Sequence, residues 1–209
     1  HTWKSFIPGG GTGRSFTNEY GYVGVAVVQD ELMMEGMNEK GLSAGLFYFP
    51  DYGRYEEYSE ANCETNISDF QLVSYILGRC ATVDEVKAEI AKVHIHGFDP
   101  RSSTVHWRFA EPSGRQIVLE IIDGKCVFYE NTLGVLTNSP SFDWQLTNLN
   151  NYVNLLPGRT EPHTLGNMSL SSFGGGSAML GLPGDFTPPS RFVRAAFFQN
   201  TAPQKPNAE

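Results

Sequence analysis

The chain has 209 residues, of which 40% are hydrophobic and 12% aromatic, which predicts a folded domain with a sizeable core and excludes a disordered chain. Its formal net charge is -8, with 15 Lys and Arg against 23 Asp and Glu, so it lacks the basic face that nucleic-acid binding requires. No run of about 18 apolar residues occurs, so no membrane-spanning helix is expected, and a small molecule is the expected partner.

The three cysteines are Cys63, Cys80 and Cys126. Their odd number and wide spacing disfavour a disulfide framework or a zinc site. Buried structural thiols in a reducing compartment are therefore expected, with the cytoplasm as the favoured location.

The first 18 residues are polar and glycine-rich, which predicts a mobile loop. Residues 22–28 and 42–49 are continuous apolar runs on either side of a polar turn at residues 35–41, and they predict two neighbouring buried strands. Residues 51–63 are rich in Tyr and Glu without a clear period, which predicts a surface loop over a site.

Two helices are predicted next, because Ser68 to Gln71 and Thr82 to Glu85 both have the capping-box pattern of a helix start. Apolar residues follow each start at helical spacing. We expect a helical hairpin that turns at residues 78–81 and packs one face on a sheet.

His94 and His96 would share one face of an extended strand, with His106 downstream. A metal site is one reading of this pattern, but no further ligand follows at a zinc-like spacing, so neither a metal nor another cofactor is expected. An antiparallel meander of four strands is predicted at residues 104–110, 115–122, 125–130 and 133–137.

The meander delivers Asn138 to the end of its last strand, before Ser139, Pro140 and Ser141, which have the turn and N-cap chemistry for a helix over residues 142–155. An amide at a strand end can donate hydrogen bonds to an oxygen that becomes negative during acyl transfer. The alternative is that Asn138 is an ordinary turn residue.

Residues 156–184 form a long stretch of Gly, Ser, Pro and Thr, which predicts a functional or interface loop, with a disordered linker as the alternative. A final helix is predicted from Thr187 as N-cap to about Phe198. Arg191 in its first turn opposes the helix dipole, which suggests that a carboxylate or a ligand holds it. Residues 200–209 are Pro-rich and polar and should be frayed.

Five stretches of sequence stand out: GMNEKGL at residues 36–42, VHW at 105–107, GVLTNSPSFDW at 134–144, LNNY at 149–152 and GLPGDFTPPSRFVR at 181–194. Together they resemble the choloylglycine hydrolase family, which comprises bile salt hydrolases and penicillin V acylases. The resemblance runs in order from about Phe16 to Phe198.

This resemblance implies an α+β fold of the N-terminal nucleophile (Ntn) hydrolases, an αββα four-layer sandwich of two antiparallel sheets flanked by helices. Residues 1–209 would form a single partial domain of that kind, with residues 156–184 as a loop or oligomerisation arm. In the family an N-terminal Cys attacks the amide carbonyl, and its own α-amine serves as the base.

The resemblance also implies three catalytic residues. Asn138 matches the family's oxyanion-hole Asn, and Arg191 matches the Arg that supports the nucleophile's thiolate. Tyr48 falls where bile salt hydrolases carry Asn and penicillin V acylases carry Tyr, and its backbone N–H would be the second oxyanion donor.

The chain departs from the family in lacking the N-terminal Cys, the Arg and Asp that follow it, and the C-terminal strands. We therefore expect an internal portion of a longer polypeptide that hydrolyses linear carbon–nitrogen amide bonds of conjugated bile salts or penicillin V, with Tyr48 favouring the latter. The alternatives are an N-acyl homoserine lactone acylase or an inactive relative that binds amphipathic amides. A homo-oligomer, as a tetramer, is the expected assembly.

Overall fold

The computed structural model describes residues 2–7, 11–27, 29–99 and 102–203. The chain divides into two compact units. The first comprises residues 1–132 together with residues 138–142, and the second comprises residues 133–137 together with residues 143–209. Each unit is described separately below.

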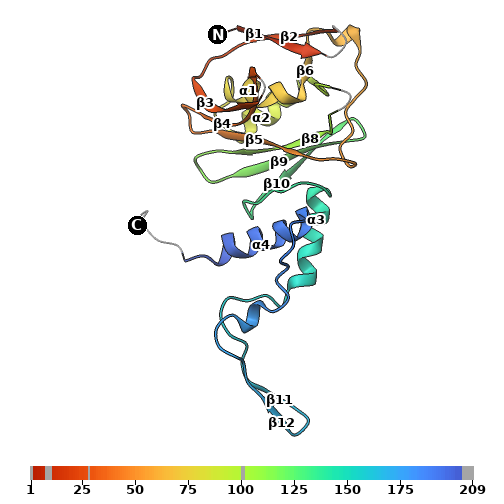
Figure 1. The fold of residues 1–209 in the computed structure, drawn as a ribbon. Coiled ribbons are helices and arrows are strands. Elements are labelled where there is room, and N and C mark those ends of the chain that lie inside the picture. Colours follow the sequence, from red (N-terminus) through yellow and green to blue (C-terminus); the bar gives the residue numbers. More distant parts are fainter. Residues whose placement is uncertain (1, 8–10, 28, 100–101, 204–209) are drawn as a thin grey trace. The chain divides into compact units, whose positions relative to one another are not determined.

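The first unit is built on a six-stranded antiparallel sheet in the order β10-β9-β8-β5-β4-β3 (Figure 1). The strands are β3 (Tyr22–Val27), β4 (Gln29–Asn38), β5 (Ser43–Tyr48), β8 (Val105–Ala110), β9 (Gln116–Ile122) and β10 (Lys125–Glu130). The first three strands of the predicted meander are confirmed as β8, β9 and β10.

The fourth predicted strand, at residues 133–137, is wrong: this described segment is not part of any sheet. Val135 is buried, as the apolar pattern suggested. However, the segment is held by hydrogen bonds from side chains to backbone rather than by pairing with another strand. Thr137 Oγ1 donates to Pro188 O at 3.1 Å, and Asn200 Nδ2 donates to Leu133 O at 3.4 Å.

The two strands expected at residues 22–28 and 42–49 are present as β3 and β5, but they are not neighbours and only β5 is largely buried. Strand β4 lies between β3 and β5, and β3 is an edge strand on which Val23 is 75% exposed. The turn expected at residues 35–41 is shorter than predicted, because residues 35–38 continue strand β4. Gly24 and Gly36 face each other in the β3–β4 ladder, where a Cβ on Gly24 would lie 2.2 Å from Glu35 O, so they allow two strands to approach closely.

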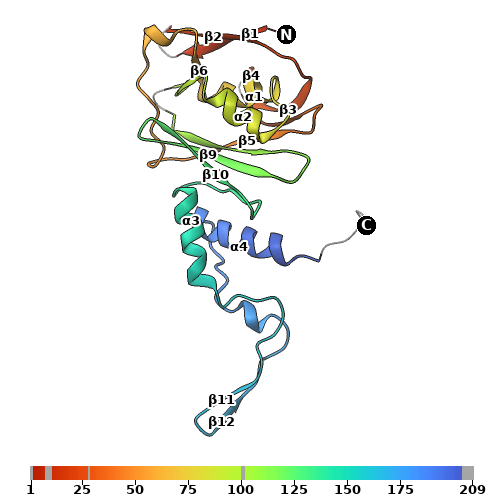
Figure 2. The same cartoon turned by 180° about the vertical axis from the view of Figure 1, so that it is seen from behind.

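One face of this sheet is covered by the predicted helical hairpin, which is confirmed as α1 (Leu72–Leu77) and α2 (Val83–Ile90) (Figure 2). Thr82 Oγ1 accepts from Glu85 N at 3.2 Å, as a capping residue should. Ser68 does not cap, since the 3-10 turn Asp69–Gln71 precedes α1 and Ser68 Oγ donates to Asp69. The core between helices and sheet includes Leu72, Ile76, Val86, Trp107 and Leu119.

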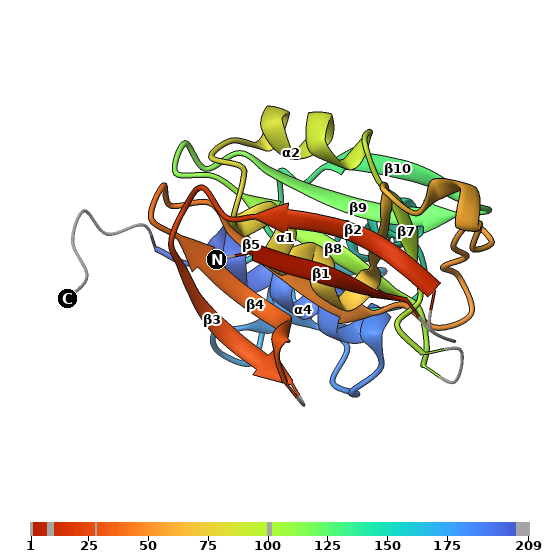
Figure 3. The same ribbon diagram turned by 90° about the horizontal axis from the view of Figure 1, so that it is seen from above.

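Strands β1 (Thr2–Ile7) and β2 (Gly11–Thr17) form a hairpin, so the loop predicted at residues 1–18 is wrong for the described part of that segment. Phe16 holds this hairpin on the core, because its buried ring packs edge-on against Tyr75 with the ring centroids 5.1 Å apart. Strands β6 (Asn66–Ser68) and β7 (His94–His96) pair in parallel. In Figures 1 and 3, α1 lies between the β1–β2 hairpin and the six-stranded sheet.

The second unit contains α3 (Phe142–Asn148, whose first residue belongs to the first unit), the 3-10 turn Leu149–Tyr152 and α4 (Pro188–Thr201). The helix predicted at residues 142–155 is thus confirmed as far as Tyr152, and the last helix is confirmed. Between them lie the hairpin of β11 (His163–Leu165) and β12 (Met168–Leu170) and the 3-10 turn Ser177–Met179. No helix in the described ranges is long and apolar enough to cross a membrane.

Candidate active site

Tyr48 is the last residue of β5, and its backbone faces away from the neighbouring strand β8. The Phe49 N–H donates to Thr104 O at 2.8 Å, and hydrogen-bonded positions alternate along an antiparallel ladder, so Tyr48 occupies a non-hydrogen-bonded position toward β8. On the other side of β5, the register with β4 extends only to Gly45, opposite Glu35, among the residues described. The N–H and C=O of Tyr48 therefore point toward a side of β5 beyond the β4 ladder.

Asn138 lies on that side. Its Nδ2 donates to Tyr48 O at 2.7 Å, although the two residues are 90 positions apart in the sequence. Tyr48 is 56% exposed and Asn138 is half-buried, so both can be reached from solvent. Because the N–H and C=O of a non-hydrogen-bonded residue share one side of the strand, this bond brings the amide of Asn138 to the side where the Tyr48 N–H points.

Two further hydrogen bonds hold the segment that begins at Asn138 onto the first unit. Ser139 Oγ donates to Pro50 O at 2.6 Å, and the Phe142 N–H donates to Glu120 Oε1 at 2.9 Å. Residues 138–142 are thus attached through their first two residues and their last.

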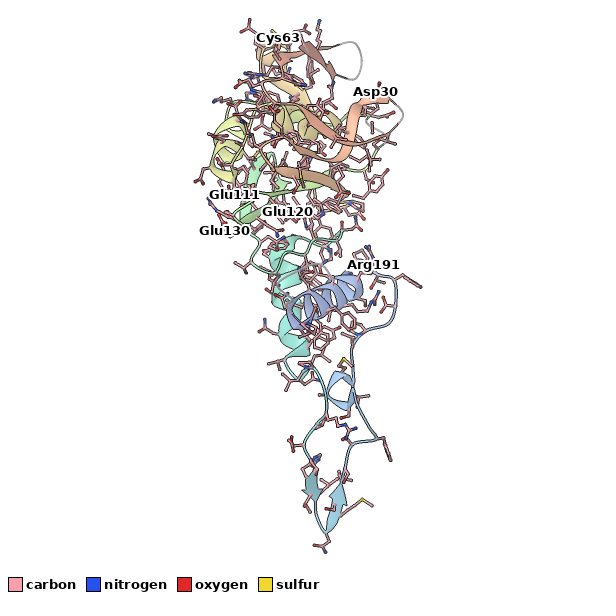
Figure 4. The ribbon with its side chains drawn as sticks, turned by 90° about the vertical axis from the view of Figure 1, so that its left-hand side faces the viewer. Asp30, Cys63, Glu111, Glu120, Glu130 and Arg191 are labelled. Atoms are coloured by element: carbon pink, nitrogen blue, oxygen red, sulfur yellow. The ribbon has the colours of Figure 1, made fainter. Side chains whose placement is uncertain are left out.

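Glu120 (Figure 4) is the charged residue of the mainly apolar strand β9. Its side chain is fully buried. Its Oε1 lies 3.0 Å from Nδ1 of His106, which is also fully buried. The ring of Phe49 stacks on His106, with the centroids 4.5 Å apart and the planes 10° apart. The pair therefore contacts both the residue after Tyr48 and the end of the segment that starts at Asn138.

Arg191 lies in the first turn of α4, in the second unit (Figure 4). Its Nε donates to Phe186 O at 3.0 Å, so a backbone carbonyl is one of its partners. Arg194 NH1 donates to both Pro183 O and Asp185 O at 2.7 Å. The two guanidinium groups therefore hold the loop that leads into α4.

Asp185 organises the same helix start. Its carboxylate accepts from Ser190 Oγ, Thr187 Oγ1 and Thr187 N, and these hydrogen bonds lower the pKa of Asp185 to about 2. Thr187 is the N-cap residue, as predicted, but its hydroxyl serves Asp185 rather than a helix N–H.

Cys80 and Cys126 lack the surroundings of an activated nucleophile. Burial raises the pKa of the Cys80 thiol to about 12, with the Glu89 carboxylate contributing. Desolvation and the Glu56 carboxylate raise the pKa of Cys126, although that residue is exposed overall. A raised pKa lowers the thiolate fraction on which nucleophilic attack depends. The expectation of buried structural thiols fits Cys80 alone, because Cys63 is half-buried.

The two histidines of β7 have protein partners. His96 Nε2 lies 2.9 Å from Asn66 Oδ1, and His94 Nδ1 lies 2.8 Å from Thr65 Oγ1. Within the described ranges no group of three or more His, Cys, Asp or Glu side chains could hold a metal ion.

Of the three predicted site residues, Asn138 and Tyr48 come together within the first unit, and Arg191 belongs to the second. Sequence reasoning missed the pairing of His106 with Glu120. The signal was available, because a Glu in the middle of the apolar strand Gln116–Ile122 must be satisfied by a buried partner.

The sequence model of the "Linear amide C-N hydrolases, choloylglycine hydrolase family" matches residues 6–209. A bile salt hydrolase/transferase of Clostridium perfringens is 37% identical over 194 residues, which are 90% of this chain and 58% of the relative. A penicillin V acylase of Pectobacterium atrosepticum is 31% identical over an alignment of 212 residues, which covers 94% of this chain and 50% of the relative.

Solved structures agree with the sequence matches. A variant of the conjugated bile acid hydrolase from Clostridium perfringens superposes with a TM-score of 0.80 at 35% identity, over 95% of this chain and 63% of that one. The penicillin V acylase from Agrobacterium tumefaciens gives a TM-score of 0.74 at 26% identity, over 99% and 58%. The α+β fold thus matches both kinds of enzyme, and the chain spans less than two thirds of their lengths. The chain belongs to the choloylglycine hydrolase family of linear amide C–N hydrolases.

Proposed function

We propose that this chain carries the oxyanion-binding part of a linear amide hydrolase. In this proposal the Asn138 side chain and the Tyr48 backbone N–H donate to the substrate carbonyl oxygen as it becomes negative. The observation that supports it most is the 2.7 Å hydrogen bond from Asn138 Nδ2 to Tyr48 O, which joins the two expected donors. A primary amide has two N–H groups, so the bond to Tyr48 orients the amide, and the second N–H is assigned to the oxyanion.

The proposed nucleophile is an N-terminal Cys that lies outside these 209 residues. Its thiolate attacks the amide carbonyl, its α-amine acts as base, and the amine product leaves before water hydrolyses the thioester. Arg191 is proposed to support the thiolate. The raised pKa values of Cys80 and Cys126 favour a nucleophile from elsewhere.

The finer architecture proposed is the αββα sandwich of the Ntn hydrolases, formed by one domain of which this chain is a part. The six-stranded sheet supports this proposal, because α1 and α2 cover one face, while Val23 and Met37, which pair on the opposite face, are 75% and 51% exposed. Segments outside these residues would complete that second sheet.

The proposed substrates are conjugated bile salts or penicillin V. Relatives named for each activity match the chain at comparable identity, so the resemblance alone does not separate them. Tyr48 favours penicillin V. The alternatives remain an N-acyl homoserine lactone acylase and an inactive relative that binds amphipathic amides.

The proposed assembly is a homotetramer, with residues 156–184 as the arm between subunits. The hairpin of β11 and β12 supports this, because Leu165 and Met168 on it are 70% and 65% exposed and Phe173 nearby is fully exposed. Exposed apolar side chains on an extended hairpin are typical of an interface.

The test uses the intact parent protein, including any segment that precedes His1. Hydrolysis of glycine- and taurine-conjugated bile salts and of penicillin V is measured side by side, with a Cys→Ala change at the N-terminal residue as control. We expect turnover of at least one amide and its loss in the control. An intact protein without an N-terminal Cys, inactive on all three substrates, would contradict the proposal and favour the binding alternative.

A further inference from the structure

We propose that Glu120, together with His106, is a positioning residue that sets the location of both oxyanion donors; this inference rests on the proposed function. The contacts described for the two side chains are with Phe47, Phe49 and Phe142 rather than with Asn138 or Tyr48. Both act through the residues that they contact.

The first link runs from Glu120 to Asn138. Glu120 Oε1 accepts the Phe142 N–H at 2.9 Å, and Phe142 is itself 1% exposed, so the end of the segment 138–142 is fixed in the interior. Only three residues separate Phe142 from Asn138. A shift of the Phe142 backbone must therefore be absorbed within this short segment, which moves the amide of Asn138.

The second link runs from His106 to Tyr48. The ring of Phe49 stacks on His106 at 4.5 Å, and Phe49 directly follows Tyr48 in the chain. His106 Nδ1 lies 3.0 Å from the same Glu120 oxygen that accepts from Phe142. One carboxylate oxygen thus connects the two donors from the interior, in addition to the bonds from Asn138 to Tyr48 O and from Ser139 to Pro50 O.

The burial of the pair argues for such a role. Moving an ionisable pair out of water is costly, and apolar residues of similar volume often give equal or greater stability. Glu120 Oε2 is buried with no hydrogen-bond partner among the described residues, which adds to the cost. The fold alone would be served by an apolar residue at this position of β9. A positional requirement at Phe142 explains why an acceptor stands there.

The experiment compares three variants of the intact parent protein. Glu120→Leu removes the acceptor for Phe142. Glu120→Gln keeps an oxygen at the position of Oε1, so it should retain both bonds. Asn38→Ala is the matched control, because Asn38 is a buried polar residue with four side-chain hydrogen bonds, none of them to residues 138–142.

Two readouts are measured: kcat and KM with penicillin V and a glycine-conjugated bile salt, and hydrogen exchange of residues 138–142 by mass spectrometry. In Glu120→Leu we expect faster exchange of that segment. We also expect a kcat lower by about a hundredfold, because misplacing a catalytic group by about 1 Å can lower the rate by that factor. KM should change less than about threefold. Glu120→Gln should retain kcat within about tenfold. Asn38→Ala should lose stability, but its kcat and its exchange at residues 138–142 should stay at the wild-type level.

Unchanged exchange of residues 138–142 in Glu120→Leu would overturn the inference, and so would faster exchange with a wild-type kcat. An equal loss of kcat in Asn38→Ala would show general destabilisation and would also overturn it. Failure of the proposed function is recognised separately, because the wild-type protein would then hydrolyse none of the amides.

Discussion

The buried carboxyl of Asp69 gives a quantitative prediction about stability. Asp69 is 1% exposed and accepts hydrogen bonds from the Phe98 and Phe70 N–H groups and from Tyr55 OH. Burial raises the pKa of Asp69 from 3.8 to about 6, against the opposing effect of these hydrogen bonds. The folded state therefore keeps a proton that the unfolded chain has already released.

This difference fixes the sign and size of the effect. Between pH 4 and pH 6 the folded state binds more protons than the unfolded state, so the Asp69 contribution to the free energy of unfolding falls as pH rises. The pKa of Asp69 differs by about 2.2 units between the two states, and one unit corresponds to about 1.36 kcal/mol. The protonated carboxyl thus contributes about 3 kcal/mol to the free energy of unfolding at low pH, and this contribution is lost above pH 6. The Asp69→Asn variant keeps an oxygen for Phe70 and Phe98 but cannot titrate.

The assay is urea unfolding of wild type and Asp69→Asn at intervals from pH 3.5 to pH 7.5. The free energy of unfolding of the variant relative to wild type should rise with pH, by up to about 3 kcal/mol, with most of the change between pH 4 and pH 6. Taking the difference removes the contributions of other groups. A pH-independent difference, or one that falls with rising pH, would refute the reasoning.

Three other predictions concern the helix cap, the oxyanion donor and the arm. Thr82→Ala should lower the free energy of unfolding by about 1 kcal/mol in urea unfolding, because it removes the acceptor of the Glu85 N–H; no loss would show that this cap is not stabilising. Tyr48→Phe should leave kcat of the intact protein within about threefold, since the proposed donor is the backbone; a hundredfold loss would assign the role to the hydroxyl instead. Replacing residues 161–172 by a short turn should reduce the mass in light scattering from tetramer toward smaller species, and an unchanged tetramer would exclude the hairpin as the arm.

Elements with local signals could be predicted from the sequence. Thr82 and Glu85 mark the start of α2, Pro188 follows the N-cap of α4, and the turn residues at 111–114 and 123–124 separate β8, β9 and β10. Each signal depends on residues within a few positions of one another. Such patterns determine the element wherever no distant partner competes.

The predictions were wrong where contacts with residues distant in the sequence determine the local structure. Residues 133–137 have the apolar content of a strand, but a strand requires a neighbour, and Thr137 instead donates to Pro188, 51 residues away. The exposure of β3 depends on its place at the edge of the sheet rather than on its apolar composition.

The candidate site divides in the same way. The sequence named Asn138 and Tyr48 through resemblance to a family, and their contact spans 90 residues that no local pattern connects. Glu120 was missed because its partner His106 lies on another strand, and no local pattern connects either residue with residues 138–142.

The most direct test of the account is the turnover of the intact protein with Asn138→Ala. Loss of one oxyanion donor should lower kcat by about a hundredfold to a thousandfold, or about 3 to 4 kcal/mol in transition-state stabilisation. Thermal unfolding should show that the variant remains folded. A folded Asn138→Ala protein with near wild-type kcat would contradict the central claim that this amide stabilises the transition state.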